Sequence, residues 1–213
     1  MIFSMSYSPF PTTSVKRFGL MGGTFDPIHM GHLILAEQAR ERFALERVLF
    51  VTSAIPPHKL NESVTNVAHR LEMTRLAVAD NEFFECSTIE IERGGPSYTI
   101  DTVRQVLNLY GPESTVYVLL GADEGQDLMK WREPYEIAKL ARIVIANRPG
   151  LALGDVIESL PQDMAGGIIA LEMPGVDISS TDLRERVRSG RSIRYLVPRV
   201  VEDYIWSKGL YRQ

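Results

Sequence analysis

The residues best suited to chemistry lie in GGTFDPIHMGH, residues 22–32, where a glycine pair is followed by two histidines three positions apart. Glycines at a turn let backbone N–H groups approach a ligand closely, which suits a phosphate or a ribose. His29 and His32 would lie on one face of the first turn of a helix. Because a helix amino terminus offers free N–H groups and the positive end of the dipole, both imidazoles could donate to an anion bound there.

Other interpretations of the histidine pair compete with this one. The two side chains could be metal ligands or proton-transfer groups, and either could be a capping or packing residue. A zinc site is the weaker interpretation, because zinc helices favour the HExxH spacing and no obvious third ligand accompanies the pair. The segment matches neither GxGxxG nor GxxxxGK[ST], so it supports neither the dinucleotide fingerprint nor the P-loop. We therefore predict a helix start that binds phosphate.

A second candidate anion site is ISSTDLRERVRSG, residues 178–190. Any of Ser179, Ser180 and Thr181 can cap the helix that this pattern predicts, and their hydroxyls add to its free N–H groups. Arg184, one turn inside, can present its planar guanidinium to two phosphate oxygens. The alternative is a well-capped surface helix with a solvated basic face. We interpret the remaining arginines of this region as surface charge: Arg186, Arg188, Arg191 and Arg194.

These two segments resemble the HxGH and ISSTxxR signatures of the nucleotidyltransferase superfamily, in the same order. The resemblance implies a Rossmann-like fold and a reaction at the α-phosphate of a nucleoside triphosphate, with His29 and His32 as the catalytic pair. It also implies that the second signature grips the β- and γ-phosphates of ATP. The ATP-binding residues that we carry over are Gly22, Gly23, Thr24, Phe25, Gly121, Asp123, Ser179, Ser180, Thr181 and Arg184.

Between the signatures the chain resembles the bacterial nicotinate-nucleotide adenylyltransferases, and this resemblance covers nearly everything from residue 17 onward. The matching blocks, in that family's order, are PPHK (56–59), GGPSYTIDT (94–102), GADEGQDLMKW (121–131), NRPG (147–150) and YLVPRVVEDYI (195–205). The resemblance implies that Tyr98, Thr99 and Trp131 surround nicotinate. It also implies that Lys59 and Arg148 lie near charged groups of the substrate.

The chemistry of these blocks agrees with those roles. Lys59 follows two prolines that stiffen its loop and would be a point charge for a phosphate. Asp123 can accept hydrogen bonds from ribose hydroxyls, although helix capping is an alternative. Trp131, expected on an exposed loop, can stack on a pyridine ring, although a core tryptophan is the usual alternative. Cys86 is expected to be a buried apolar residue rather than a nucleophile.

The reaction implied is transfer of the adenylyl group of ATP to nicotinate mononucleotide, giving nicotinate adenine dinucleotide and pyrophosphate. The acceptor phosphate is already anionic near neutral pH, so no general base is required. We expect Mg²⁺ to be carried mainly by the phosphates of ATP. The alternatives are an adenylyltransferase for nicotinamide mononucleotide or another phosphate acceptor, and a nucleotide-binding regulator without catalysis.

The elements that must position these residues are alternating strands and helices. Apolar runs predict strands at 17–21, 47–53, 84–92, 115–121, 142–148 and 167–173. Apolar spacing of three or four predicts helices over 33–43, 67–78 and 103–110, and two more over 180–190 and 198–207. Such alternation favours an α/β fold with a doubly wound parallel sheet and helices on both faces. In that fold the first turn after strand 17–21 lies where ligands bind.

Composition narrows the class of protein. With 213 residues, 45% of them hydrophobic, we expect a flexible lead over 1–15 and a single domain over 16–213, with a helical C-terminal part from about 178. The net charge of −4 disfavours nucleic acid as a partner, including an RNA-binding synthetase role. No apolar run approaches the ~20 residues that span a bilayer. The single cysteine cannot form an intramolecular disulfide, which suits the cytoplasm. The sequence leaves a homo-oligomer open.

Overall fold

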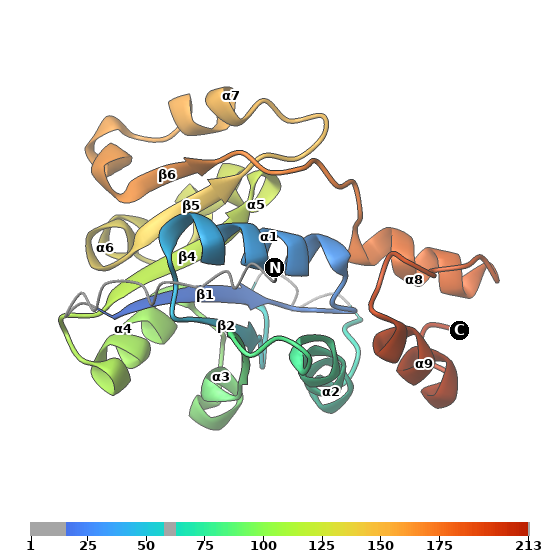
Figure 1. Cartoon of the computed structure of the whole chain (residues 1–213). Helices are drawn as coiled ribbons and strands as arrows, with labels where there is room; N and C mark the ends of the chain where they lie inside the picture. The colour runs from blue at the N-terminus through green and yellow to red at the C-terminus, as the bar shows by residue number, and fades with distance from the viewer. Residues whose placement is uncertain (1–15, 58–62, 213) are drawn as a thin grey trace, which may run out of the picture.

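A six-stranded parallel sheet organises the described residues, which are 16–57 and 63–212 of the computed structural model (Figure 1). The strands are β1 (Arg17–Gly23), β2 (Arg47–Thr52), β3 (Phe84–Ser87), β4 (Thr115–Gly121), β5 (Arg142–Ala146) and β6 (Ile168–Leu171). Their order is β3-β2-β1-β4-β5-β6, and every neighbouring pair is parallel. The order reverses beside β1, so the doubly wound Rossmann-like prediction is confirmed, and the carboxyl end of β1 is the expected ligand site.

Helices connect the strands and extend beyond the last one. The α-helices of the described residues are α1 (Met30–Phe43), α2 (Val67–Val78), α3 (Ile89–Arg93), α4 (Thr99–Tyr110), α5 (Ala122–Gln126), α6 (Pro134–Leu140), α7 (Leu153–Glu158), α8 (Ser180–Arg188) and α9 (Arg199–Lys208). Short 3-10 turns cover Leu128–Lys130 and Gln162–Gly167. The helices predicted over 67–78, 180–190 and 198–207 are confirmed as α2, α8 and α9. The helices α5, α6 and α7 had no predicted counterpart.

Two hydrophobic cores lie on opposite faces of the sheet. Successive residues of a strand point to opposite faces, so Leu119 joins one core and Leu120 the other. The first core holds buried residues of α1, α2, α8 and α9, and the second holds those of α4, α6 and α7. Burial on both faces explains why the central strands are continuous apolar runs.

The prediction of one strand over 84–92 is wrong in its second half. β3 ends at Ser87, and α3 follows from Ile89. The alternation IEIE favoured a strand, but five residues cannot distinguish a period of 2 from a single helical turn. What decides is tertiary contact, because Ile89 packs into the second core and the Glu90 carboxylate accepts a 2.6 Å hydrogen bond from the Thr102 hydroxyl. Both contacts are made with residues of other helices and strands, which a local pattern cannot show.

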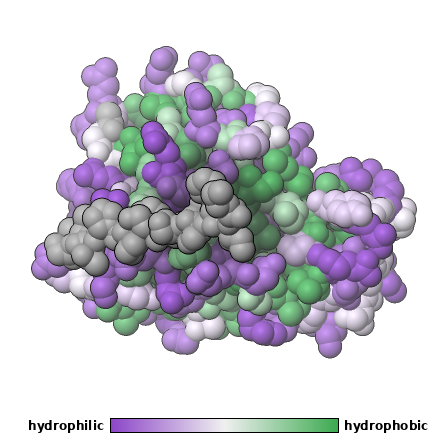
Figure 2. Space-filling model, viewed as in Figure 1, coloured by the Kyte–Doolittle hydropathy of each residue, from purple (hydrophilic) through white to green (hydrophobic). Residues whose placement is uncertain are grey.

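The helical C-terminal part lies beside the end of β1 and the start of α1, as Figure 1 shows for α8 and α9. The backbone N–H of Met30 donates to the carbonyl of Leu196 at 2.9 Å, which joins the segment between α8 and α9 to the first turn of α1. Figure 2 shows hydrophobic residues among hydrophilic ones across the middle of this face. In the described part of the chain, no helix is long and apolar enough to cross a membrane. The predicted lead, residues 1–15, lies outside the described residues.

Candidate active site

The glycine pair ends β1, as predicted, and its two members differ in surroundings. A Cβ on Gly23 would lie 2.8 Å from Cε1 of Phe25, so the ring of Phe25 occupies the space that a side chain would need. Gly22 is exposed and would meet nothing within 4 Å. Phe25 has a φ of 49° and is only 2% exposed. Its side chain therefore packs in the first core, so only its backbone is left to approach a ligand.

The two histidine rings stack on each other at the start of α1, with centroids 3.7 Å apart and planes at 27°. The backbone N–H of His29, the N-cap residue, donates to Nδ1 of His32 at 3.2 Å. Because Nδ1 of His32 accepts, a neutral His32 carries its proton on Nε2. The edge of Phe25 supports the His32 ring, with centroids 5.1 Å apart. The spacing of three thus brings both rings to one place, as the sequence predicted.

Burial keeps both imidazoles neutral. Burial and, to a smaller extent, the nearby positive charge of Arg148 together lower the pKa of His29 to about 4. Burial also holds the pKa of His32 well below its usual range, helped by His29 and then by Arg148. At neutral pH each ring is therefore a neutral donor and acceptor. Nδ1 of His29 is buried and has no hydrogen-bond partner among the described residues.

The signature at the start of α8 is joined directly to residues 26–29, the segment that leads into the histidine pair and is called the histidine turn below. Ser179 is the N-cap, and its hydroxyl oxygen accepts from the N–H of Asp182 at 3.1 Å. The Ser180 hydroxyl donates to the carbonyl of Pro27 at 2.9 Å. Arg184 Nη1 donates to the carbonyl of Asp26 at 2.8 Å, and its Nη2 donates to the Thr181 hydroxyl at 3.3 Å. Two segments about 150 residues apart are therefore joined, and each holds a helix amino terminus, the kind of site where an anion can bind.

Asp123 and Arg148 meet at the ends of β4 and β5. Arg148 Nη1 donates to Oδ2 of Asp123 at 2.6 Å, and Nη2 lies 3.5 Å from Oδ1 of Asp177. Asp123 also lies close to the N-cap of α5, because a Cβ on Gly121 would lie 2.7 Å from its Oδ1. The sequence assigned these two residues to different ligands. The structure shows one ion pair, whose cation also acts on the histidine pair.

The residues predicted to surround nicotinate lie at the start of α4 and after α5. Tyr98 is the N-cap of α4, and Thr99 is its first residue. Trp131 is half-buried against the second core, as Tyr98 is, so it is neither fully exposed nor fully a core residue. The Arg132 guanidinium lies over the Tyr98 ring, 4.8 Å from its centroid. The two blocks therefore lie side by side.

The PPHK block approaches the same place from β2. The N–H of Ala54 donates to the Ser97 hydroxyl oxygen at 2.9 Å, and Ile55 forms an isolated parallel bridge with Pro96. The segment before Pro56 is thus joined to the segment before Tyr98. Lys59, the predicted phosphate ligand, lies outside the described residues.

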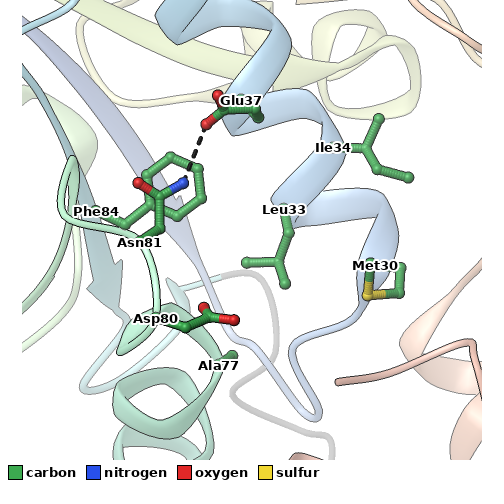
Figure 3. Close-up of a pocket in the computed structure, with 8 residues that line it drawn as sticks. All are labelled: Met30, Leu33, Ile34, Glu37, Ala77, Asp80, Asn81 and Phe84. Atoms are coloured by element: carbon green, nitrogen blue, oxygen red, sulfur yellow. Dashed lines mark hydrogen bonds between the residues drawn. The ribbon is translucent and has the colours of Figure 1, made fainter. Parts of the chain in front are cut away.

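A pocket elsewhere on the molecule holds none of the predicted site residues. It has a volume of about 250 Å³ and lies between α1 and the end of α2, where Asn81 donates to the Glu37 carboxylate at 3.1 Å (Figure 3). Figure 3 shows Leu33 and Met30 along its α1 side. The candidate site is therefore defined by converging polar groups rather than by this pocket.

Sequence reasoning missed Arg70, a buried arginine of α2 that is 2% exposed. Its guanidinium donates to the carbonyls of Thr24 at 2.7 Å, Ser53 at 2.8 Å and Thr65 at 2.8 Å. Burial lowers the pKa of Arg70, and the charge of Asp26 opposes that shift. The arginine thus ties the glycine turn to the end of β2. The available signal was a charged residue four positions from Thr74, on the apolar face of the predicted helix.

The sequence also gave Asp26 no role beyond a turn. The side chain is 4% exposed, and its Oδ2 accepts from the N–H of Thr65 at 3.0 Å. Its Oδ1 accepts from the hydroxyl of Tyr211 at 2.7 Å. No pattern in the sequence could link positions 26 and 211, because the contact spans 185 residues. Cys86 is half-buried with its pKa raised to about 11 by burial, in line with a packing role.

Comparisons with known proteins give one consistent picture. Residues 20–186 match the cytidylyltransferase-like family. A "probable nicotinate-nucleotide adenylyltransferase" of Moorella thermoacetica is 47% identical, with 94% of each chain covered. A protein of the same name from Thermus thermophilus is 46% identical over 92% of this chain and 100% of its own. The fold matches that of Plasmodium falciparum nicotinic acid mononucleotide adenylyltransferase complexed with NaAD, with a TM-score of 0.77, 20% identity, and 92% and 97% of the chains covered.

Proposed function

The chain belongs to the nicotinate-nucleotide adenylyltransferases of the cytidylyltransferase-like family, and from this premise we propose how its residues carry out the reaction. The enzyme transfers the adenylyl group of ATP to nicotinate mononucleotide in NAD biosynthesis and releases pyrophosphate. The acceptor phosphate attacks the α-phosphate, a bond from the acceptor oxygen to phosphorus forms, and the bond to the β-phosphate oxygen breaks. No proton has to leave the nucleophile, since its second pKa is about 6.

The histidine pair stabilises the charge that builds up on the α-phosphate. A neutral His32 donates from Nε2, because its Nδ1 already accepts from the backbone of His29. His29 adds a second donor, and the start of α1 adds its N–H groups. Donors that are already in place cost no reorganisation during the reaction. One observation carries this proposal: the two signatures come together in the structure, because Ser180 and Arg184 bond to the histidine turn.

The amino terminus of α8 holds the departing pyrophosphate. Ser180, Thr181 and Arg184 supply hydroxyls and a guanidinium there, and each already hydrogen-bonds within the turn or within α8. Arg184 would exchange or share its bond to the Asp26 carbonyl when phosphate oxygens arrive. Asp123 accepts from ribose hydroxyls with one carboxylate oxygen while the other stays paired with Arg148. Gly22, Gly23 and Thr24 approach ATP through their backbone.

Magnesium enters the reaction as part of the substrate, MgATP. Mg²⁺ keeps much of its water and is commonly bound through substrate phosphates, whose negative charge it neutralises. In the described residues there is no group of three or more His, Cys, Asp or Glu placed to hold a metal ion. Removal of Mg²⁺ with EDTA should abolish turnover, and re-addition should restore it. Undiminished turnover in EDTA would contradict this part of the proposal.

Nicotinate binds between the α4 start and the segment after α5. Trp131 stacks on the pyridine ring, and the N–H groups and hydroxyls of Tyr98 and Thr99 receive the carboxylate. Lys59, Arg148 or both neutralise the mononucleotide phosphate.

We propose the cytoplasm as the location of the protein, since its one cysteine can form no intramolecular disulfide.

The test of substrate is a comparison of initial rates on nicotinate and nicotinamide mononucleotides with MgATP, measured as pyrophosphate release. We expect nicotinate mononucleotide to be strongly preferred, because an amide cannot replace a carboxylate in a site built from donors. Equal rates, or faster turnover of nicotinamide mononucleotide, would show that nicotinate mononucleotide is not the preferred acceptor. Absence of release with both acceptors would favour a nucleotide-binding regulator.

A further inference from the structure

We propose that Tyr211 is a positioning residue for catalysis, because its hydroxyl fixes the buried carboxylate of Asp26 and through it the turn that carries the histidine pair. The inference rests on the proposed function and adds to it a residue from the far end of the described chain. The hydroxyl donates to Oδ1 of Asp26 at 2.7 Å. Neither side chain is a ligand of ATP or of the mononucleotide in the scheme above.

Asp26 is held from several sides at once. Its carboxylate accepts from Tyr211 and from the N–H of Thr65, and its own carbonyl accepts from Arg184. The side chain is 4% exposed, so water cannot readily replace a lost donor. Two residues further on, Ile28 is fully buried, and His29 then caps α1. The position of Asp26 therefore sets both the histidine turn and the resting place of the Arg184 guanidinium.

The acidic residue of the motif thus acts away from the substrate. A carboxylate beside three phosphates would repel them, but this one is directed into the protein, where it meets a phenol and a backbone amide. Burial raises the pKa of the Tyr211 hydroxyl, and the charge of Asp26 raises it further, so the hydroxyl stays a donor at any physiological pH. The hydrogen bond consequently holds the two residues in place and transfers no proton.

Misplacement of the turn should affect the transition state more than the ground state. Binding of ATP draws on many contacts, whereas stabilisation of the α-phosphate needs the two imidazoles and the helix start in register. A shift of about 1 Å can cost up to about 100-fold in rate. We therefore expect loss of the hydroxyl to lower kcat and to leave the KM of ATP nearly unchanged.

Tyr204 provides a matched control on α9. Its hydroxyl also makes a side-chain hydrogen bond to another element, at 2.9 Å from Nδ1 of His69, but it does not contact the turn. Tyr211→Phe and Tyr204→Phe each remove one hydroxyl from the C-terminal part. They differ in which group loses its partner, since only Tyr211 bonds to the buried carboxylate of the turn.

The experiment measures kcat, both KM values and thermal unfolding for the full chain and the two variants. We expect Tyr211→Phe to lower kcat about 10- to 100-fold and Tyr204→Phe to leave it within about twofold. Tyr211→Phe should also unfold at a somewhat lower temperature, because it leaves a buried carboxylate short of a donor, so kcat is measured well below both melting temperatures. Wild-type kcat in Tyr211→Phe, equal losses in both variants, or a rise in KM alone would overturn the inference.

A second measurement decides without any substrate. Amide hydrogen exchange in the peptide covering residues 22–32 should quicken in Tyr211→Phe and not in Tyr204→Phe. If the wild type released no pyrophosphate, the proposed function would fail, but hydrogen exchange would still test whether the Tyr211–Asp26 bond holds the turn. Asp26→Asn, alone and with Tyr211→Phe, gives a double-mutant cycle. The double variant should lose little more exchange protection than the worse single variant, and full additivity would contradict the shared contact.

Discussion

Two regions of the candidate site differ in how they are held. The proposed phosphate half, around residues 22–32, is held by buried bonds across the chain, whereas the proposed pyridine half, around Tyr98 and Trp131, is held by a few half-buried or exposed contacts. Around the histidine turn, Asp26 and Arg70 are 4% and 2% exposed and bind groups on other segments. Around Tyr98, the neighbouring Arg132 side chain is 52% exposed, and its nearest carboxylate oxygens lie 3.6 Å and 3.9 Å away. The difference agrees with the proposed roles, in which a preorganised half serves chemistry and a less constrained half serves recognition.

His32→Ala is the strongest test of that division. We expect turnover to fall about 1,000-fold, because an oriented donor to the α-phosphate disappears, while the fold persists. Steady-state kinetics and circular dichroism would measure both. His69→Ala removes a histidine outside the site, on α2, and should leave turnover nearly unchanged. Near-normal turnover in His32→Ala would remove this residue from the catalytic role.

Acid should destabilise the phosphate half through the buried neutral histidines. The pKa of His29 is about 4 in the folded chain against 6.5 for an unperturbed imidazole, so the unfolded chain binds more protons between these values. The free energy of unfolding therefore falls as the pH drops through this window, by ~1.4 kcal/mol per pH unit for this group. Denaturant unfolding at several pH values would measure the slope. His29→Gln should reduce it, and an unchanged slope would contradict the assignment.

Trp131→Ala tests the pyridine half. Loss of stacking should raise the KM of nicotinate mononucleotide about tenfold, with a smaller effect on the KM of ATP. Trp206→Ala changes the other tryptophan of the chain, which lies on α9 under Arg212, and is the matched control. Equal rises in both KM values would show that Trp131 supports the site as a whole rather than the pyridine.

The smallest effect is expected on the outer face of α8. Arg186 pairs with Asp182 at 2.6 Å on a partly exposed surface, two residues after Arg184, which binds the Asp26 carbonyl. Arg186→Gln should change kcat less than about twofold and stability by less than ~0.5 kcal/mol. Turnover and denaturant midpoints would check both. A large loss of kcat would show that the anion surface extends further along α8 than Arg184.

Local patterns predicted most of the fold, including the helix starts at the two signature segments. Continuous apolar runs located the six strands, and three candidate capping residues located the start of α8, among which the structure selects Ser179. The same reasoning could not find Arg70 or the role of Asp26, because their meaning lies in carbonyls and hydroxyls contributed by distant segments. It also extended β3 into α3, where Ile89 and Glu90 are fixed by tertiary packing. The catalytic and binding roles carried over from the resemblance remain predictions, that of Lys59 among them.

The contact between Tyr211 and Asp26 also bears on the order of folding. It closes a loop of 185 residues, and bringing such distant segments together costs chain entropy that only the finished sheet and its docked helices can offset. The histidine turn lies early in the sequence, yet it should acquire its final shape among the last steps of folding, after α9 has packed. A refolding chain would then recover its secondary structure before it recovers turnover.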